Sequence, residues 1–233
     1  MAFSKSDVVI LAGGLGTRLR EVVSDRPKPL APIRGRPFLD LLLEQLAASG
    51  CVSRAILAIG YQAEKMVDYY QQVESPLPLV FSVEKELLGT GGALRLAMPL
   101  IKSPTVLVVN GDTFVSVNYR SFYSFHEEKK SELTLAAIKA EGNRYGSIDY
   151  DPASHKLKGF FEKQEDSREK WVSAGLYLMR TNLLENLESN KVLSLEKDVF
   201  PAWVNRASFC FPLNASFIDI GTKESYMRAQ SVL

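Results

Sequence analysis

Apolar residues follow a repeating order in the first half of the chain, where short β-branched runs alternate with segments of helical spacing. This order predicts strands at 8–12, 54–60, 79–83 and 105–109, with helices at 38–48, 64–72 and 93–98 between them. Alternating strands and helices favour an α/β fold with a mostly parallel sheet and helices on both faces. Ligands of such sheets bind beyond the carboxyl ends of the strands.

The pattern becomes more mixed after residue 112. A helical stretch at 119–128 precedes strand-like segments at 133–139, 146–150, 157–161 and 172–179, and helical patterns return at 181–187, 195–204 and 222–229. No stretch has the composition of a linker or a repeat. We therefore expect a single domain over residues 1–233, with a first lobe up to about residue 115 and a β-rich second lobe from about residue 116.

Charged side chains are balanced, with 28 basic and 27 acidic residues and a formal net charge of +1. This balance gives no overall electrostatic reason to expect nucleic acid or a membrane as a partner. No apolar run approaches the roughly 18 residues that span a bilayer, and the first residues lack the pattern of a secretory signal. We therefore expect a cytoplasmic protein.

Cysteines and histidines offer no recognisable catalytic or metal-binding arrangement. Cys51 and Cys210 are too few for a disulfide framework and are not spaced like zinc ligands, so we expect two buried thiols. His126 and His155 lack the setting of a catalytic triad and are expected at the surface or partly buried. The chemistry must therefore come from other residues.

A glycine-rich loop follows the first predicted strand. In Gly14-Leu15-Gly16-Thr17-Arg18, the backbone can turn several N–H groups toward an anion, and Arg18 adds a fixed positive charge. The loop lacks the Lys-Ser/Thr pair of a Walker A motif, and Leu19 stands where a dinucleotide fingerprint has its third glycine. Taken alone, the loop is equally consistent with a phosphate site and with a structural turn.

The motifs that follow resemble those of the sugar-1-phosphate nucleotidyltransferase family. They are Gly13 to Leu19, then Pro27-Lys28-Pro29-Leu30, Asn110-Gly111-Asp112, and Ile218 to Thr222, in the family's order. The resemblance covers the chain from residue 8 to about residue 226. It implies a Rossmann-like fold in which a sugar 1-phosphate attacks the α-phosphate of a nucleoside triphosphate, releasing pyrophosphate and leaving an NDP-sugar.

The resemblance implies that five residues are catalytic, namely Arg18, Lys28, Asp112, Lys163 and Asp219. Nucleotidyl transfer requires positive charge around the phosphates and in-line positioning of the attacking oxygen, and lysine and arginine supply that charge. The two prolines that flank Lys28 indicate a stiff, extended segment.

Two of these catalytic residues also suit a metal ion. Asp112 follows a buried strand and should emerge at its carboxyl end, and strand alternation turns Asp219 away from Ile218 and Ile220. Carboxylate oxygens completed by phosphate and water suit Mg²⁺. The resemblance supplies the pairing of Asp112 with Asp219 as the magnesium site.

The resemblance also indicates a sugar site. Glu162 and Lys163 resemble the family's Glu-Lys element, in which glutamate binds a sugar hydroxyl and lysine the sugar phosphate. Gly146 matches the glycine whose backbone approaches the sugar, although a hairpin turn explains it equally well. Ser173 stands where the family usually has asparagine, and its single hydroxyl offers fewer hydrogen bonds. This difference weakens an assignment to the commonest hexose substrates.

A second glycine-rich segment resembles the family's base-binding loop. Its glycines are expected to let the backbone approach the nucleoside closely. Glu84 precedes this loop, and a carboxylate accepts hydrogen bonds from the adjacent N–H donors of guanine, so Glu84, or less readily Glu86, favours GTP. The residues expected to bind the nucleotide are Leu11, Ala12, Gly13, Gly14, Gly16, Thr17, Glu84, Gly89, Thr90 and Gly91.

Within the family, the short chain and these motifs look most like D-glycero-α-D-manno-heptose 1-phosphate guanylyltransferases. Mannose-1-phosphate guanylyltransferase and a uridylyl- or thymidylyltransferase acting on another sugar 1-phosphate are the alternatives. A catalytically inactive nucleotide-sugar-binding subunit is a further alternative, and the presence of the five catalytic positions argues against it. The sequence leaves the oligomeric state open, a homo-oligomer included.

Overall fold

The computed structural model describes residues 5–140, 145–161 and 170–233. Its strands are β1 (Ser6–Leu11), β2 (Pro32–Ile33), β3 (Arg36–Pro37), β4 (Val52–Ile59), β5 (Leu79–Val83), β6 (Thr105–Asn110), β7 (Thr113–Val115), β8 (Leu133–Ala140), β9 (Ser147–Tyr150), β10 (Leu157–Phe161), β11 (Lys170–Arg180), β12 (Ser208–Leu213) and β13 (Phe217–Asp219). Its α-helices are α1 (Phe38–Ala48), α2 (Ala63–Gln72), α3 (Gly89–Ala97), α4 (Tyr119–Glu128), α5 (Phe200–Trp203) and α6 (Lys223–Val232).

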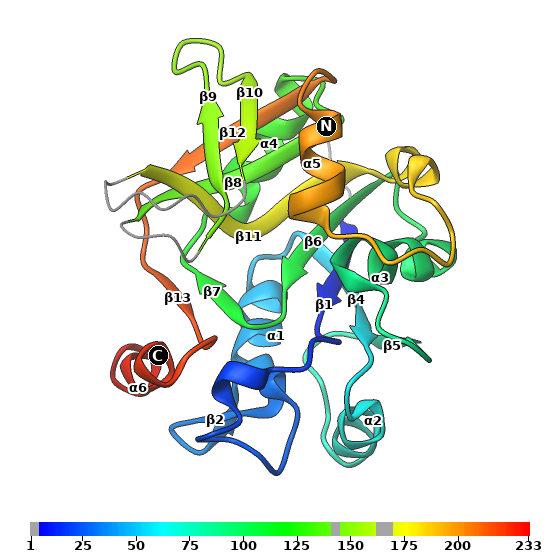
Figure 1. Ribbon diagram of the computed structural model, residues 1–233, viewed down its shortest axis with the longest axis vertical. Coiled ribbons are helices and arrows are strands. Elements are labelled where there is room, and N and C mark those ends of the chain that lie inside the picture. Colours follow the sequence, from blue (N-terminus) through cyan, green and yellow to red (C-terminus); the bar gives the residue numbers. More distant parts are fainter. Residues whose placement is uncertain (1–4, 141–144, 162–169) are drawn as a thin grey trace.

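The main sheet has nine strands in this described part of the chain, and it runs through both halves of the sequence (Figure 1). The strands β6, β1, β4 and β5 lie side by side and parallel, with Val9 of β1 paired to Ile56 on one side and Val108 on the other. Fully buried runs of valine, isoleucine and leucine are typical of such strands. The predicted parallel sheet is confirmed.

The other half of the sheet is mixed, as expected. The long strand β11 is antiparallel to all its neighbours: β6 and β9 pair with different parts of one edge, and β8 pairs with the other edge. Beyond them, β9 pairs with β10 antiparallel and β12 pairs with β8 parallel. The second lobe is therefore a direct continuation of the same sheet, joined to the first lobe through the β6–β11 pairing.

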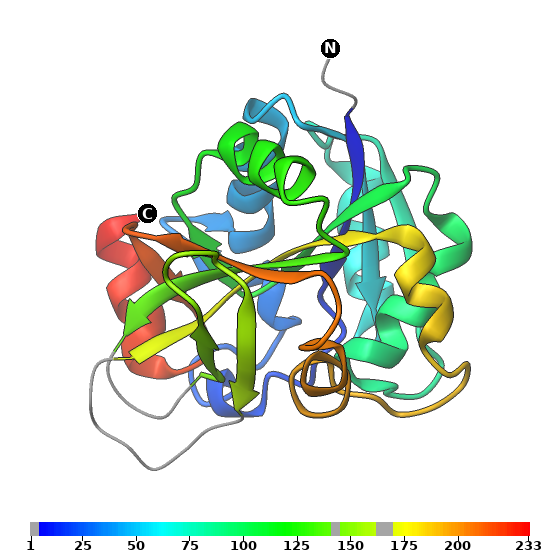
Figure 2. The ribbon, with the colours of Figure 1, turned by 90° about the horizontal axis from the view of Figure 1, so that it is seen from above.

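Helices cover both faces of the sheet because neighbouring strand residues point in opposite directions. Val8 and Ile10 of β1 pack on one face with α1, α2 and α4, whereas Val9 packs on the other with α3 and α5. Figure 2 shows α4, in green, and α5, in orange, on opposite sides of the strands. Among the described residues, no helix combines the length and apolar character needed to cross a membrane.

Several elements differ from the sequence-based expectation. The segment 181–187, expected as a helix, forms a 3₁₀ helix at Thr181–Asn186. The segment 195–204 is helical as expected, but it begins with a π-helical turn at Leu195–Val199 that leads into α5. The strands β2, β3, β7 and β12 were not expected, and only the alternation around Asp219 indicated β13. The strands β7 and β13 have three residues each and pair with one another, which is too short a pattern to predict either strand reliably.

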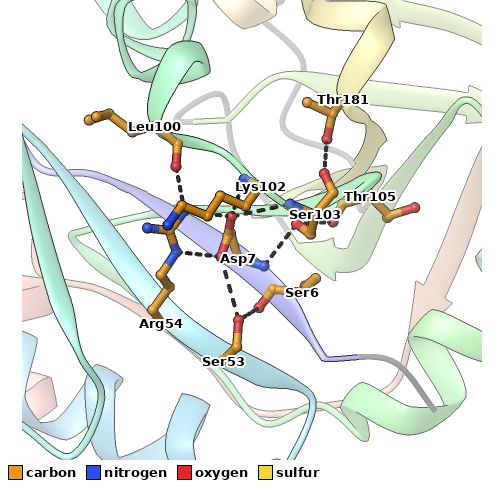
Figure 3. Close-up of polar contacts among 9 residues, drawn as sticks. All are labelled: Ser6, Asp7, Ser53, Arg54, Leu100, Lys102, Ser103, Thr105 and Thr181. Atoms are coloured by element: carbon orange, nitrogen blue, oxygen red, sulfur yellow. Dashed lines mark hydrogen bonds and ion pairs between the residues drawn. The ribbon is translucent and has the colours of Figure 1, made fainter. Parts of the chain in front are cut away.

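A buried ion pair closes the amino-terminal edge of the parallel strands (Figure 3). The Asp7 carboxylate accepts hydrogen bonds from Nε and Nη2 of Arg54 at 2.8 and 3.0 Å and from the backbone of Lys102 at 2.5 Å. Burial alone would raise the pKa of Asp7, but these donors and the charge of Arg54 lower it below its usual value. The pair ties β1 to β4 and to the segment before β6.

Candidate active site

A cleft of about 590 Å³ opens beyond the carboxyl ends of β1 and β6, where the fold predicts a ligand. It is lined by Leu11, Ala12, Gly13, Gly14, Leu15, Gly16, Thr17, Arg18, Lys28, Pro29, Glu84, Leu87, Gly89, Thr90, Ala93, Asn110, Gly111, Asp112, Tyr177, Ser194, Leu195, Glu196 and Gly221. The cleft therefore gathers all the expected nucleotide-binding residues except Gly91, together with three of the five expected catalytic residues.

The first glycine-rich loop is held in a turn that faces Lys28. Gly16 has a φ of 60°, and a Cβ atom there would lie 3.2 Å from Cβ of Lys28. The side chain of Arg20 donates from Nε to the carbonyl of Leu15 at 3.3 Å, and its guanidinium lies 4.5 Å from the centre of the Tyr61 ring. Glycine at position 16 thus permits both the left-handed backbone and the close approach to Lys28.

Lys28 begins a 3₁₀ turn, so the expected extended segment is wrong. The turn is closed by hydrogen bonds from Leu30 to the carbonyl of Pro27 and from Ala31 to that of Lys28, each 2.9 Å long. A residue before proline prefers an extended backbone. The hydrogen bonds of the turn and the burial of Pro29 and Leu30 stabilise the 3₁₀ conformation by more than this preference. The two prolines that flank Lys28 thus belong to a hydrogen-bonded turn instead of an extended segment.

Asp112 lies where the sequence predicted, just beyond the end of β6. Its carboxylate Oδ2 accepts a hydrogen bond from the ammonium of Lys28, and the two form an ion pair. Burial would raise the pKa of Asp112, but the Lys28 charge and hydrogen bond outweigh it and lower this pKa below its ordinary value. The site thus holds an ionised carboxylate beside a charged lysine.

Asp219 is brought next to Asp112 by the small β7–β13 sheet. Asp219 pairs with Thr113, and the following residue, Ile220, donates its N–H to the carbonyl of Asp112 at 2.9 Å. Asp219 as a residue is 6% exposed; its Oδ1 accepts from the Gly221 N–H at 2.7 Å, and its Oδ2 accepts from the Tyr145 hydroxyl. The fold therefore brings the backbones at Asp112 and Asp219 together, and the pairing of their carboxylates at a metal ion stays a prediction.

The donor atoms of the two aspartates are compatible with the proposed magnesium ion. Each carboxylate oxygen has two acceptor positions, so the donors from Lys28, Gly221 and Tyr145 leave further positions for a hard cation. Within the described ranges, no three His, Cys, Asp or Glu side chains gather into a complete set of ligands. Mg²⁺ needs no such set, because it commonly binds one or two carboxylates and takes its remaining ligands from phosphate and water.

Glu84 lies in the cleft wall beyond β5. Its Oε2 accepts a hydrogen bond from the Leu88 N–H at 2.8 Å, and its Oε1 lies so near Gly13 that a Cβ atom there would clash with it. Burial raises the pKa of Glu84, and the bond from Leu88 offsets this rise in part. The glutamate therefore shapes the turn before the second glycine loop and also presents a carboxylate to the cleft.

The glycines of the second loop make room for another part of the protein. A Cβ atom on Gly89 would lie 2.5 Å from the Leu193 carbonyl oxygen, and one on Gly92 would lie 2.6 Å from that of Lys191. A Cβ atom on Gly91 would lie 3.0 Å from Cβ of Leu193. These glycines therefore accommodate the segment 191–195, and Gly91 is buried beneath it. Gly89 still lines the cleft, so the approach of its backbone to the nucleoside stays a prediction.

None of the four residues expected to bind the sugar lines this cleft in the part of the chain that the structure describes. Glu162 and Lys163 lie outside the described residues. A Cβ atom on Gly146 would meet the Phe160 ring at 2.6 Å, so packing requires this glycine.

Ser173 is buried and does not line the cleft. Its hydroxyl hydrogen-bonds the Tyr177 hydroxyl at 2.9 Å and accepts from the Gly175 N–H at 3.2 Å. Ser173 therefore positions Tyr177 in this structure.

Tyr177 and the residues Ser194–Glu196 line the cleft without having been expected there. Tyr177 lies in an apolar strand, and its neighbours gave no reason to assign it to a ligand site. The signal that could have located 194–196 is Ser194, whose side chain caps the following turn by accepting from the Lys197 N–H at 3.2 Å. A cap locates a turn, however, and does not indicate that the turn reaches a ligand.

The chain is similar to known nucleotidyl transferases over nearly its whole length. The family model described as nucleotidyl transferase matches residues 7–233. The chain is 33% identical to the D-glycero-alpha-D-manno-heptose 1-phosphate guanylyltransferase of Aneurinibacillus thermoaerophilus, over 97% of this chain and 98% of that protein. It is 30% identical to the mannose-1-phosphate guanylyltransferase of Mycobacterium tuberculosis, over 100% of this chain and 66% of that protein.

Solved structures give a similar picture. The crystal structure of HddC from Yersinia pseudotuberculosis superposes with a TM-score of 0.86 at 35% identity, covering 97% of this chain and 98% of that one. A second crystal structure of the same protein, complexed with GMP-PN, superposes with a TM-score of 0.84.

Proposed function

Since the chain belongs to the nucleotidyl transferase family, we propose that it is a guanylyltransferase that joins GTP to D-glycero-α-D-manno-heptose 1-phosphate. Pyrophosphate and GDP-heptose are the products. The observation that carries this proposal is the arrangement of Lys28, Asp112 and the first glycine loop around one cleft at the carboxyl ends of β1 and β6. The near full-length similarity to heptose 1-phosphate guanylyltransferases supports the choice of substrates.

In the proposed reaction, a phosphate oxygen of the sugar 1-phosphate attacks the α-phosphorus of GTP. A P–O bond forms, the bond to the β-phosphate breaks, and pyrophosphate carries away the electron pair. The backbone of Gly14 and Gly16 and the side chain of Arg18 bind the triphosphate, and Lys28 balances negative charge beside Asp112. The protein contributes mainly positioning and electrostatic stabilisation.

Magnesium is the proposed cofactor, held by Asp112 and Asp219. When bound there, it would neutralise charge on the phosphates. The Tyr145 hydroxyl and the Gly221 N–H orient the Asp219 carboxylate, and Lys28 orients that of Asp112. Guanine is proposed to donate to Glu84, whose Oε1 lies in the cleft wall beside Gly13.

The proposal places the enzyme in the cytoplasm. Cys51 and Cys210 are both free and buried, and unpaired thiols suit a reducing compartment. Mannose 1-phosphate is the second candidate substrate, because mannose-1-phosphate guanylyltransferases are also about 30% identical to this chain.

Pyrophosphate release with GTP, heptose 1-phosphate and Mg²⁺ tests the proposal, using the wild-type protein and the Asp112→Asn variant. We expect release from the wild type and a fall of about 10³-fold or more in the variant, with an unchanged thermal unfolding midpoint. No release from folded wild-type protein with any sugar 1-phosphate would contradict the proposal and favour an inactive nucleotide-sugar-binding subunit. Equal release from both proteins would refute the role of Asp112.

A further inference from the structure

Two residues outside the cleft contact the first glycine-rich loop from behind. Arg20 follows the short helix Thr17–Leu19, is exposed, and does not line the cleft. Its Nε donates to the carbonyl of Leu15 at 3.3 Å, and its guanidinium lies 4.5 Å from the centre of the Tyr61 ring. Tyr61 does not line the cleft either. Arg20 and Tyr61 together form a clamp on the loop.

Tyr61 also contacts the loop through its own backbone. Its N–H donates to the carbonyl of Gly13 at 3.2 Å, just after the end of β4. The next residue, Gln62, has a φ of 53°, begins α2 as its N-cap, and donates from Nε2 to the Tyr61 hydroxyl at 3.2 Å. The tyrosine is thus held on both sides of its ring, and a fixed aromatic ring is a suitable platform for a guanidinium.

The clamp determines the direction of two N–H groups of the loop. The carbonyls of Gly13 and Leu15 accept hydrogen bonds from the clamp. In a planar trans peptide, the C=O of one residue and the N–H of the next point in opposite directions. The N–H groups of Gly14 and Gly16 therefore point away from the clamp. Since the clamp lies outside the cleft that these glycines line, their N–H groups are directed toward the cleft.

Two backbone N–H groups turned to the same side suit an anion. Such donors form a concave site for phosphate oxygens, and donors that are already oriented need no reorganisation when the ligand arrives. Glycine backbones have many accessible conformations, and Gly16 uses one with a φ of 60°. A loop with three glycines therefore needs outside contacts to keep one conformation, and the clamp supplies two of them.

We propose that Arg20, with Tyr61 as its platform, is a positioning residue that holds the glycine-rich loop in the conformation that binds the triphosphate. This inference rests on the proposed function, because it concerns the phosphate part of the same cleft. It predicts that the clamp affects the binding of phosphates and leaves the binding of the nucleoside unaffected. Arg20 acts through the carbonyl of Leu15, without contacting the phosphates itself.

Calorimetric titrations of the Arg20→Met variant test this inference, with GTP, inorganic pyrophosphate and guanosine as separate ligands in the presence of Mg²⁺. Methionine keeps an unbranched side chain but cannot donate to Leu15. We expect Kd for GTP and for pyrophosphate to rise about 5- to 20-fold, while Kd for guanosine changes less than about 2-fold. Arg26→Met is the matched control, because Arg26 is an exposed arginine of the same segment that pairs with Asp25 at 2.6 Å. This control should match the wild type.

Tyrosine variants test the platform without removing a charge. Tyr61→Phe keeps the ring and should bind GTP like the wild type, whereas Tyr61→Leu loses the platform and should bind GTP about 2- to 5-fold more weakly. Because Arg20 and Tyr61 act as one unit, the double variant Arg20→Met/Tyr61→Leu should weaken binding by less than the product of the two single effects.

Salt distinguishes the position of the loop from the charge of the arginine. In about 0.5 M KCl, attraction between exposed charges is largely screened, but the ratio of Kd values between Arg20→Met and the wild type should persist. A ratio that disappears in salt, an equal loss of guanosine binding, or unchanged Kd values for GTP in Arg20→Met and Tyr61→Leu would overturn the inference. A wild type that forms no nucleotide sugar would instead overturn the proposed function.

Discussion

The ammonium of Lys28 donates a hydrogen bond to the carboxylate of Asp112, across 84 positions of the sequence. One residue comes from a proline-flanked 3₁₀ turn and the other from the end of β6. Their ion pair joins the segment after the first glycine loop to the carboxyl edge of the sheet. This contact is central to the proposed catalytic arrangement, because it holds a positive and a negative side chain next to each other in the lining of one cleft.

Replacing Lys28 with methionine should lower kcat by about 10²- to 10³-fold. The variant keeps the length of the side chain but removes the positive charge beside Asp112 and the phosphates. Rates at saturating GTP and sugar 1-phosphate measure the effect. The control is Lys65→Met, since Lys65 is exposed and its ammonium donates to the Asp25 carbonyl at 2.7 Å. Equal rates for the two variants would contradict the role of Lys28.

Removing the Tyr145 hydroxyl should weaken the use of Mg²⁺. Tyr145→Phe leaves Oδ2 of Asp219 without this donor, so the carboxylate is less well oriented. We expect the Mg²⁺ concentration for half-maximal rate to rise about 10-fold. Tyr70→Phe removes a hydroxyl that donates to Asp40 at 2.8 Å between α2 and α1, and should leave the Mg²⁺ dependence unchanged. The same Mg²⁺ dependence in Tyr145→Phe and wild type would show that Tyr145 does not position Asp219.

Changing Glu84 to glutamine should reduce the preference for GTP. An amide presents both a donor and an acceptor, which suits uracil or thymine better than the adjacent donors of guanine. We expect the ratio of kcat/KM for GTP to that for UTP to fall about 10-fold or more. Glu86→Gln is the control, because Glu86 is exposed and does not line the cleft. If Glu86→Gln changes the ratio and Glu84→Gln does not, the base-binding carboxylate has been misassigned.

An added methyl group at Gly92 should destabilise the protein. In Gly92→Ala, the new Cβ atom would meet the Lys191 carbonyl oxygen and Cβ of Leu88, both at 2.6 Å. We expect the free energy of unfolding to fall by about 1–3 kcal/mol in urea titrations. Gly14→Ala is the comparison, because its new Cβ atom has no neighbour within 4 Å and should leave stability nearly unchanged. Equal stabilities would mean that segment 191–195 does not pack as the structure indicates.

His126 should make stability decrease in mild acid. The sequence-based expectation of a surface or partly buried histidine is wrong, because His126 is fully buried with Nδ1 bonded to Thr134 at 2.8 Å. Burial, and secondly the charge of Arg180, lowers its pKa from 6.5 to about 3. Between these values the unfolded chain binds the proton and the folded chain does not, so stability is lost as the pH falls below about 6.5.

Urea unfolding at pH 7.5 and pH 5.0 measures this loss. For the wild type, we expect this histidine to contribute a decrease of about 2 kcal/mol between the two pH values. His126→Leu should reduce that decrease, whatever its effect on stability at pH 7.5, while His155→Gln should keep it. A wild-type decrease that persists unchanged in His126→Leu would contradict the assignment.

Local patterns predicted much of the fold and part of the site. Helix Phe38–Ala48 and strand Leu79–Val83 have the expected bounds, since each is a clear periodic segment bounded by turn signals. The loop at Gly14 and the end of β6 at Asp112 were located because glycines follow apolar runs there. The motifs of the resembled family then identified Lys28 and Asp219, which no local pattern would have selected.

The remaining features depend on contacts between distant segments. The pairing of Asp219 with Thr113 comes from strands too short to recognise. The glycines of the second loop looked like ligand contacts, although they accommodate the Lys191–Leu193 backbone, because a glycine pattern alone does not reveal what packs against it. Glu196 escaped notice for the same reason, since only the packing of its turn brings it to the cleft.

The most direct test of the central claim is a competition experiment with wild-type protein. GTP, UTP, dTTP, CTP and ATP are supplied together at equal concentrations with Mg²⁺ and equal amounts of heptose, mannose and glucose 1-phosphates, and the nucleotide sugars are identified by mass spectrometry. The account predicts GDP-heptose as the main product, with equimolar pyrophosphate. A main product carrying uridine or thymidine, or a hexose in place of the heptose, would contradict the proposed substrates, and the absence of any nucleotide sugar would contradict the proposed enzyme.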